Sequence, residues 1–123
     1  MPYDAGVPRS SNTQAELGRR LCPPESVLDH ITDGSDVIVA VANGAPDTVL
    51  DAIEAGADRF DDVRLHQMLP LRDRPYLRGE RPRLRHVSWF LSDCDRQAFA
   101  DGHCDLVPNN FSDVPALLRR TAR

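Results

Sequence analysis

The chain has 123 residues, of which 19 are acidic and 15 basic, so its formal net charge is −4. This length is typical of one domain, and 41% hydrophobic residues supply enough side chains for one core, which excludes disorder throughout. The longest apolar run, residues 37–42, is far shorter than the roughly 20 residues of a membrane span. The mild acidity argues against general nucleic-acid binding, which needs surplus basic side chains.

All 15 basic residues are Arg. Lysine chemistry, including Schiff bases and the Walker phosphate loop, is therefore excluded. Cys22, Cys94 and Cys104 are too few and too widely spaced to predict a disulfide framework. The first 14 residues show no apolar signal-peptide segment. We therefore expect a cytoplasmic protein.

Residues 1–21 are expected to form a flexible arm and lead-in. Residues 1–12 combine Pro, Gly, Ser and Asn with no apolar period, which is typical of irregular chain. The folded domain is expected over residues 22–123. It begins with a short predicted helix over residues 24–31, whose apolar residues share one face.

Residues 36–42 are continuously aliphatic, which is typical of a parallel strand that lies centrally in a sheet and is covered on both faces. The run leads into the Asn43-Gly44 turn signal. A helix is predicted next, over residues 47–60, because its apolar residues recur on one stripe. The sequence therefore predicts a strand, a tight turn and a helix.

Further elements alternate along the rest of the chain. Strands are predicted over residues 63–69, 87–91 and 105–107, and helices over residues 95–100 and 112–120. Residues 70–85 form a long polar connection, and Ser112 or Asp113 is expected to cap the last helix. This alternation predicts an α/β domain with a mainly parallel sheet and flanking helices.

The first candidate binding feature is the turn formed by Asn43, Gly44, Ala45 and Pro46, between a strand's carboxyl end and a helix start. Ligands of open parallel sheets bind at such turns, because backbone N–H groups and the helix dipole converge on a negative group. The alternative is an ordinary strand-to-helix turn in which Gly44 merely supplies a permissive backbone.

The second feature is a basic stretch with a local charge of +4, since six arginines stand among only two acids, Asp73 and Glu80. The arginines are Arg72, Arg74, Arg78, Arg81, Arg83 and Arg85. A phosphate-bearing ligand such as coenzyme A would be attracted to them. The alternative is a solvated surface loop, which the prolines of this stretch favour.

A metal site is not predicted. Cys94, His103 and Cys104 lack the spacing of paired ligands, and a fourth ligand is missing. The chain has no GxSxG elbow either, and no catalytic residue is assigned.

Residues 22–120 resemble the N-terminal domain of the acetyl-CoA hydrolase and transferase family, which includes the 4-hydroxybutyrate and acetate CoA-transferases. The resemblance is most specific in one ordered set: Arg85-His86, Ser88, Phe90, Arg96, Ala98, Gly102, Asp105, Pro108, Ser112 and Pro115. An earlier block adds Gly34-Ser35-Asp36, Gly44, Pro46 and Leu50.

The resemblance implies a CoA-transferase sheet of the NagB/RpiA-like type and action on short acyl-CoA thioesters and carboxylates. Full-length members pair this domain with a second one, which carries the glutamate that attacks the thioester. No residue among Glu16, Glu25, Glu54 and Glu80 stands in anything like that motif. Family domains also continue into more strands. We therefore expect an incomplete domain that is inactive alone.

The residues expected to contact substrate are the turn 43–46 with His86, Ser88 and Asn109. They would line a pocket for a coenzyme A thioester, with no bound cofactor, and a C-terminal-type domain on another chain or a second copy would complete it. Two alternatives remain: a non-catalytic module that binds coenzyme A or another phosphate ligand, and an assembly or remnant protein. Neither nucleic acid nor membrane is an expected partner.

Overall fold

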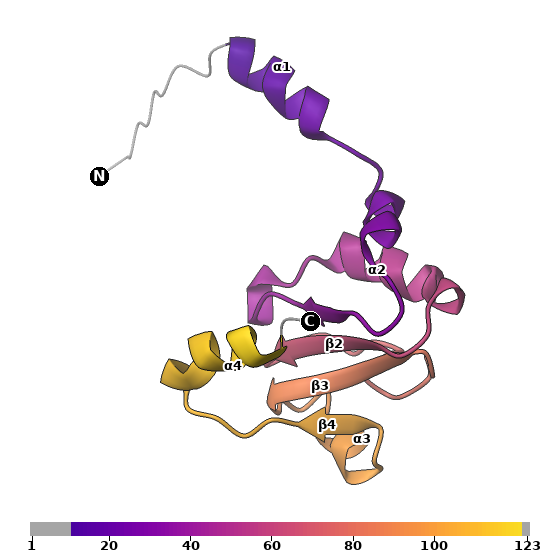
Figure 1. Ribbon diagram of the computed structural model, residues 1–123, viewed down its shortest axis with the longest axis vertical. Helices are drawn as coiled ribbons and strands as arrows, with labels where there is room; N and C mark the ends of the chain where they lie inside the picture. The colour runs from indigo at the N-terminus through magenta and orange to yellow at the C-terminus, as the bar shows by residue number, and fades with distance from the viewer. Residues whose placement is uncertain (1–10, 122–123) are drawn as a thin grey trace.

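A computed structural model of the protein describes residues 11–121 and contains a four-stranded sheet in the order β1-β2-β3-β4 (Figure 1). The strands are β1 (Asp36–Ile38), β2 (Val63–Met68), β3 (Leu84–Phe90) and β4 (Cys104–Leu106). Neighbouring strands are parallel in every pair. The expected α/β class with a parallel sheet is therefore confirmed.

The helical elements are α1 (Ser11–Arg20), η1 (Pro24–His30), η2 (Ala42–Gly44), α2 (Asp47–Ala55), η3 (Ala57–Arg59), α3 (Arg96–Ala100), η4 (Phe111–Asp113) and α4 (Val114–Thr121). Strands that follow one another along the chain are neighbours in the sheet, so right-handed crossovers all pass over one face. We call this the core face. The opposite face, which α4 approaches near the carboxyl ends of β1 and β2, is the second face (Figure 1).

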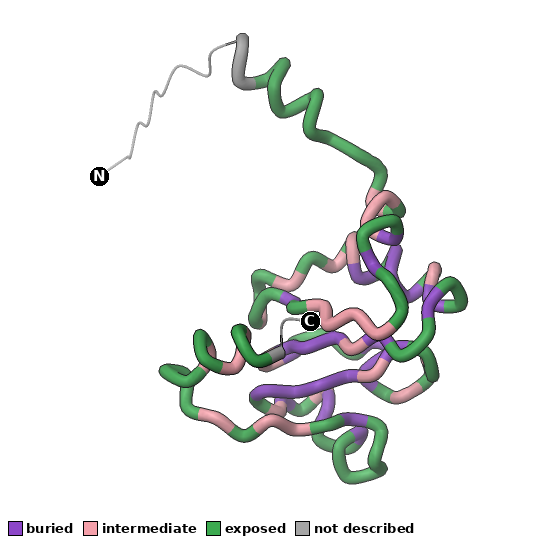
Figure 2. The backbone as a smooth tube through the Cα atoms, in the orientation of Figure 1, coloured by how far each residue is buried: buried purple, intermediate pink, exposed green. Residues whose placement is uncertain are grey.

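The hydrophobic core lies between the core face and the elements η1, α2 and η3. Leu50 and Ile53 stand three residues apart on α2 and are 1% and 2% exposed. They pack with Val63 and Leu65 of β2, which are fully buried. Full burial of one such side chain contributes roughly 1.5–3 kcal/mol. Figure 2 shows the burial concentrated in the two middle strands.

The first strand differs from its prediction. It is parallel, but it pairs only with β2, at an edge of the sheet that the described residues form. Only residues 36–38 are strand, and Ile38 and Val41 are 49% and 47% exposed. Val39 is buried on the core face, whereas the neighbouring Ile38 points to the thinly covered second face. A continuous aliphatic run does not by itself place a strand centrally.

The predicted helix over residues 47–60 is interrupted at Gly56. α2 ends at Ala55 and the chain continues as η3. A Cβ on Gly56 would lie 2.6 Å from Leu28 Cδ1, so η1 packs directly against this backbone. The apolar stripe nevertheless continues to Phe60, which is 4% exposed.

The connection between β2 and β3 folds into the core, so the expectation of a solvated loop is wrong for its centre. Tyr76 and Leu77 are fully buried, and Arg74 is 8% exposed. The Glu54 carboxylate accepts hydrogen bonds from the Tyr76 N–H at 2.9 Å and from Arg74 at 3.2 Å. These bonds fasten the connection to α2.

The two ends of the described chain also differ from expectation. α1 covers the end of the predicted arm and most of the lead-in, with an ion pair between Arg20 and Glu16 at 2.8 Å. Residues 1–10 of the predicted arm lie outside the described residues. The last helical segment begins at Phe111, one residue before its prediction, as η4, and its N-cap is Asn110 rather than Ser112 or Asp113. The Asp113 carboxylate accepts a hydrogen bond from the Asn110 N–H at 3.1 Å, so Asp113 is the second residue of a capping box.

Candidate functional site

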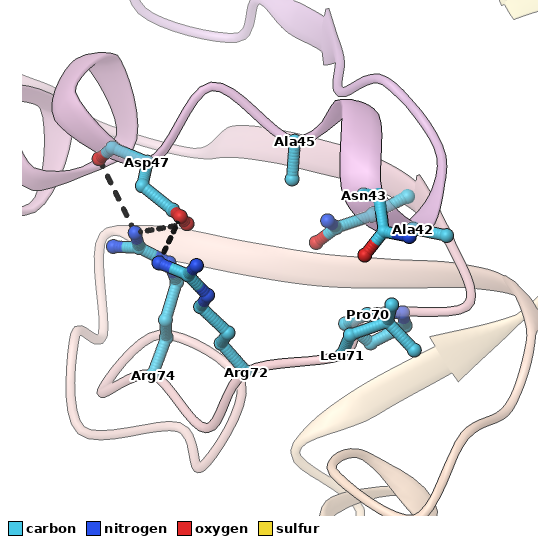
Figure 3. A pocket seen from close by; sticks show the side chains of 9 residues that line it. Ala42, Asn43, Ala45, Asp47, Pro70, Leu71, Arg72 and Arg74 are labelled. Carbon is cyan, nitrogen blue, oxygen red and sulfur yellow. Dashed lines mark hydrogen bonds and ion pairs between the residues drawn. The ribbon is translucent and has the colours of Figure 1, made fainter.

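A small cavity of about 60 Å³ lies at the carboxyl ends of β1 and β2 (Figure 3). One wall is the turn that follows β1, and the other is the segment that follows β2. The lining residues are Ala42, Asn43, Ala45, Asp47, Gln67, Pro70, Leu71, Arg72 and Arg74. Ligands of open parallel sheets bind at this edge. Asn43 and Ala45 of the predicted turn therefore stand where the sequence predicted them.

The bend of this turn is at Ala42 rather than at its glycine. Ala42 has a φ of 49°, in the left-handed region, and Gly44 does not. The interpretation of Gly44 as the permissive position is therefore wrong. The N–H groups of Gly44 and Ala45 donate to the carbonyls of Val41 and Ala42 at 2.9 and 3.1 Å. Because the turn uses these donors internally, side chains supply the polarity of the cavity.

Two arginines meet Asp47 on one side of the cavity (Figure 3). Arg72 forms an ion pair with the Asp47 carboxylate, and Arg74 donates to it at 2.8 Å. The hydrogen bond from Arg74 and the charge of Arg72 outweigh desolvation and lower the pKa of Asp47. Asp47 is therefore ionised at neutral pH.

The Arg74 side chain is bound by three acidic side chains of α2. It donates to Asp51 at 2.7 Å and to Glu54 at 3.2 Å in addition to Asp47. Burial opposes its charge, but these hydrogen bonds outweigh burial and raise the pKa of Arg74. Arg72 is different, because its side chain is 73% exposed at the cavity rim. Arg74 is therefore structural, and Arg72 is the cation that a ligand can reach.

Gln67 forms another part of the wall. Its Oε1 accepts from the Tyr76 hydroxyl at 2.5 Å, which fixes the amide next to the cavity. Desolvation of the buried phenol is the main reason why the pKa of Tyr76 is raised, so Tyr76 stays a neutral donor. Gln67 and Asn43 thus bring two carboxamides to the cavity from different elements.

His86 and Ser88 do not line this cavity. Both are fully buried on the core face of β3. The His86 ring lies edge-on to Tyr76, with ring centroids 5.7 Å apart, and its Nε2 is 3.0 Å from Asp95 Oδ2. The structure therefore does not bring these two predicted site residues together with the turn.

The acid that pairs with His86 is Asp95. Ser92 holds its other oxygen through a backbone N–H at 2.7 Å. Burial would raise the pKa of Asp95, but the hydrogen bonds with His86 and with the Ser92 N–H outweigh burial and lower it. Cys104 of β4 lies beside the same pair, and burial raises the pKa of its thiol to about 11.

The remaining predicted site residues lie elsewhere. The Asn109 amide donates to the carbonyls of Trp89 and Val107 at 3.1 and 2.8 Å, which ties the chain after β4 to β3. Asn109 borders a separate open hollow next to Trp89. Gly44 and Pro46 belong to the turn but do not line the cavity.

The basic stretch is largely neutralised by acids. Five of its six arginines form ion pairs: Arg72 and Arg74 with Asp47, Arg78 with Asp73 and Glu80, Arg83 with Asp61, and Arg85 with Asp105. Most partners are distant in sequence, so a local charge of +4 overstated the field that a phosphate would meet.

Sequence reasoning did not assign Asp47 or Gln67 to the site. Asp47 was assigned to a helix start, and Gln67 was one polar residue of an alternating strand. Arg72 was recognised only as one of six arginines. The available signal is their position at the carboxyl edge of the sheet. Asp47 follows the turn after β1, Gln67 stands next to the end of β2, and Arg72 lies four residues beyond that end.

Comparisons with known proteins place the chain near CoA transferases. The succinyl-CoA:cyclohexane-1-carboxylate CoA transferase of Geobacter metallireducens is 26% identical over 106 residues, which cover 86% of this chain and 24% of the relative. The 4-hydroxybutyrate coenzyme A transferase of Clostridium kluyveri is 27% identical over 101 residues, which cover 81% and 24%. These relatives confirm the predicted resemblance. The chain spans about a quarter of their length.

Solved structures share the fold. RipA from Yersinia pestis superposes with a TM-score of 0.70 at 24% identity, over 89% of this chain and 29% of that one. No family model matches the sequence. Among residues 11–121, no helix combines the length and apolar character that crossing a bilayer requires.

Proposed function

We propose that this chain forms part of a CoA-transferase that acts on short acyl-CoA thioesters and carboxylates. It supplies one wall of the substrate cleft, and a glutamate on another polypeptide segment is the nucleophile. One observation carries the proposal: a polar cavity at the carboxyl edge of the sheet, in a chain that resembles CoA transferases over more than four-fifths of its length.

The size of the cavity sets what it binds. A volume of about 60 Å³ is well below the roughly 300–1,000 Å³ of typical small-molecule sites. It holds about two waters at roughly 30 Å³ each, which is the scale of a carboxylate. Arg72 attracts the negative group, and the Asn43 amide donates to it. The rest of a coenzyme A thioester must contact other segments.

The glutamates of the described residues support inactivity of the chain alone. The Glu54 carboxylate is 9% exposed and bonded to Arg74 and to the Tyr76 N–H. Glu80 is bonded to Arg78, and Glu16 to Arg20. Glu25 lies in η1, which leads to the amino end of β1 rather than to the cavity. A nucleophile needs an accessible carboxylate that is poised at the substrate.

The second face supports a missing partner segment. An apolar groove of about 230 Å³ lies between the sheet and α4, lined in part by Ile38, Met68, Trp89 and Leu118. Phe111, at its end, is 76% exposed. The remainder of a CoA-transferase-type fold, on another chain or on a second copy, would cover this groove.

We assign the protein to the reducing cytoplasm, because its three cysteines are free.

The first test combines turnover with ligand titration. The purified chain is incubated with succinyl-CoA or acetyl-CoA and a carboxylate acceptor, and we expect no thioester loss above background. Butyrate is then titrated while backbone and side-chain amide resonances are recorded. We expect shifts confined to Asn43, Gln67 and their neighbours, and reduced shifts in Arg72→Gln.

A matched control separates this site from general anion binding. Arg78→Gln removes an arginine of the same stretch that does not line the cavity, so butyrate binding should be unchanged. Turnover that depends on a glutamate of this chain would contradict the proposal. Tight binding of coenzyme A alone, with shifts along the whole basic stretch, would instead favour the non-catalytic module.

A further inference from the structure

The cluster beneath α3 brings together three residue types that ligate transition metals. His86, Asp95 and Cys104 each offer a ligand atom, and these atoms all lie within 4.8 Å of one another. The three residues are 0%, 0% and 3% exposed. The substrate cavity does not include them, so this cluster is separate from the proposed function.

The fold fixes the three side chains in place. His86 and Cys104 are register partners on β3 and β4, so their side chains stand next to each other on the core face. Asp95 Oδ1 accepts from the Ser92 N–H at 2.7 Å, which turns Oδ2 toward His86 Nε2 at 3.0 Å. A site of this kind needs no large rearrangement to close around one ion.

Without an ion, the cluster is incompletely satisfied. Ser88 Oγ, two residues along β3 from His86 on the same face, is buried and has no hydrogen-bond partner among residues 11–121. An unpaired buried polar atom costs roughly 1–3 kcal/mol. Such a group needs an explanation, and an unrecorded ion or water is a common one.

Charge balance favours a divalent ion. A carboxylate, a thiolate and a neutral imidazole together carry two negative charges, so one divalent cation gives a neutral buried site. The thiol of Cys104 loses its proton to solvent when the Sγ–metal bond forms. The hydrogen between His86 Nε2 and Asp95 moves to Nδ1 when Nε2 ligates the ion, so one proton is released overall.

We propose that His86, Asp95 and Cys104 form a binding site for one divalent cation of the zinc class. The mixed nitrogen, oxygen and sulfur donor set is one that Zn²⁺ accepts in tetrahedral geometry. The Ser88 hydroxyl, which is buried and unpartnered on the same face of β3, or a water takes the fourth position. The ion joins β3, β4 and the start of α3, so its role is structural.

An entry route lies beside the cluster. An open hollow between α3 and the connection 70–83 is lined by Asp93 and Asp101, by the ion pair of Asp73 with Arg78, and by Cys94, Gln97 and Ala98. The carboxylates of Asp93 and Asp101 attract cations to the outer side of α3, a helix of only five residues. Local opening of so short a helix exposes the ligands beneath it.

The test uses the whole chain, freed of metal by a chelator and titrated with Co²⁺. We expect one ion per chain, with intense tetrahedral d–d bands and a near-ultraviolet thiolate-to-cobalt band. Zn²⁺ should displace the cobalt and raise the thermal unfolding midpoint. The Cys104→Ser variant should lose the thiolate band and bind Zn²⁺ more than about 10-fold more weakly.

Matched controls identify the thiol. Cys22→Ser and Cys94→Ser change cysteines outside the cluster, so both should keep the thiolate band. In case Cys104→Ser does not fold, the unmodified chain is alkylated with and without Zn²⁺ and digested. Zinc should protect Cys104 but neither other cysteine.

Absence of a thiolate band in the unmodified chain would overturn the proposal. So would a band that disappears with Cys22→Ser, or zinc that leaves the alkylation of Cys104 unchanged. None of these readouts depends on coenzyme A or on turnover, so failure here leaves the proposed function standing.

Discussion

The two faces of the sheet are built differently. The core face buries aliphatic side chains from η1, α2 and the strands, and its ionic groups are enclosed with their partners, as Arg74 is with Glu54. The second face carries half-exposed residues such as Ile38 and an apolar groove beside α4. In Figure 2, most residues of α4 are exposed, whereas most residues of the middle strands β2 and β3 are buried.

The difference follows from topology. Parallel neighbours that follow one another along the chain need right-handed crossovers, and these all pass over the same face. One face is therefore completed by the connections themselves. Cover for the other face must come from the chain after β4, and among the described residues its helical elements are η4 and α4.

The largest expected effect comes from breaking the buried ion pair between Arg74 and Glu54 on the core face. Arg74→Met leaves the buried Glu54 carboxylate without its cation, so unfolding free energy should fall by about 3–5 kcal/mol. Arg72→Met is the control, because that side chain is 73% exposed and its ion pair should contribute at most about 1 kcal/mol. Denaturant unfolding measures the free energy of unfolding of both variants. Equal losses would mean that the buried ion pair of Arg74 contributes no more than the exposed one of Arg72.

The next effect compares the apolar residues of the two faces directly. Leu65→Ala removes a fully buried core side chain and should cost about 2–5 kcal/mol. Ile38→Ala removes a side chain that is 49% exposed on the second face, and about 1 kcal/mol is expected. A larger, concentration-dependent loss for Ile38→Ala would indicate that self-association covers the second face.

A third comparison concerns two glycines with positive φ in connections near the core face. Gly79 has a φ of 75°, and a Cβ there would lie 2.6 Å from His103 Cγ. Gly102 has a φ of 79°, but no atom lies within 4 Å of its Cβ position. Gly102→Ala should cost about 1 kcal/mol for backbone strain, and Gly79→Ala clearly more, in thermal unfolding. Equal costs would show that the His103 contact yields easily.

The smallest expected effect concerns how the free energy of unfolding changes at acid pH, to which both faces contribute. The pKa values of Asp95 on the core face and Asp36 on the second face are lowered in the folded protein. The unfolded chain therefore binds protons first, near its ordinary Asp pKa of about 3.9. The stability that the two lowered pKa values contribute is fully present above that pH. It is lost as the pH falls through the pKa values of the folded protein.

Substitution should flatten that acid dependence at the two positions. Asp95→Asn and Asp36→Asn should each reduce the slope of unfolding free energy below about pH 4. Asp93→Asn is the control, because its side chain is fully exposed. A slope unchanged by Asp95→Asn would contradict the role of the His86 hydrogen bond.

Local pattern predicted most of the elements. Val63–Met68 and Cys104–Leu106 are strands within one or two residues of their predictions, because alternation and flanking turn signals are local properties. The split of the helix at Gly56 was not predictable, since it arises where Leu28 packs against that backbone. The edge position of β1 depends on which strand pairs with it, and its own residues do not encode this.

The site was predictable only in its position. Asn43 and Ala45 were assigned because ligands collect at the carboxyl edge of parallel strands. Arg72 joins them through Asp47, which stands 25 positions earlier in the chain. His86 and Ser88 were assigned through the family resemblance, and the structure places them under α3 instead. Sequence spacing does not show whether a strand residue reaches a cavity or the core.

By itself, then, the sequence determined the α/β class, the order of its strands and helices, and the resemblance to CoA transferases. Each of these depends on residue pattern along the chain. Only the tertiary structure decided which charges are paired, as Arg74 is, and which titratable groups converge, as His86 and Cys104 do. Those features depend on which distant residues the crossovers bring onto one face, and a linear pattern does not specify distance in space.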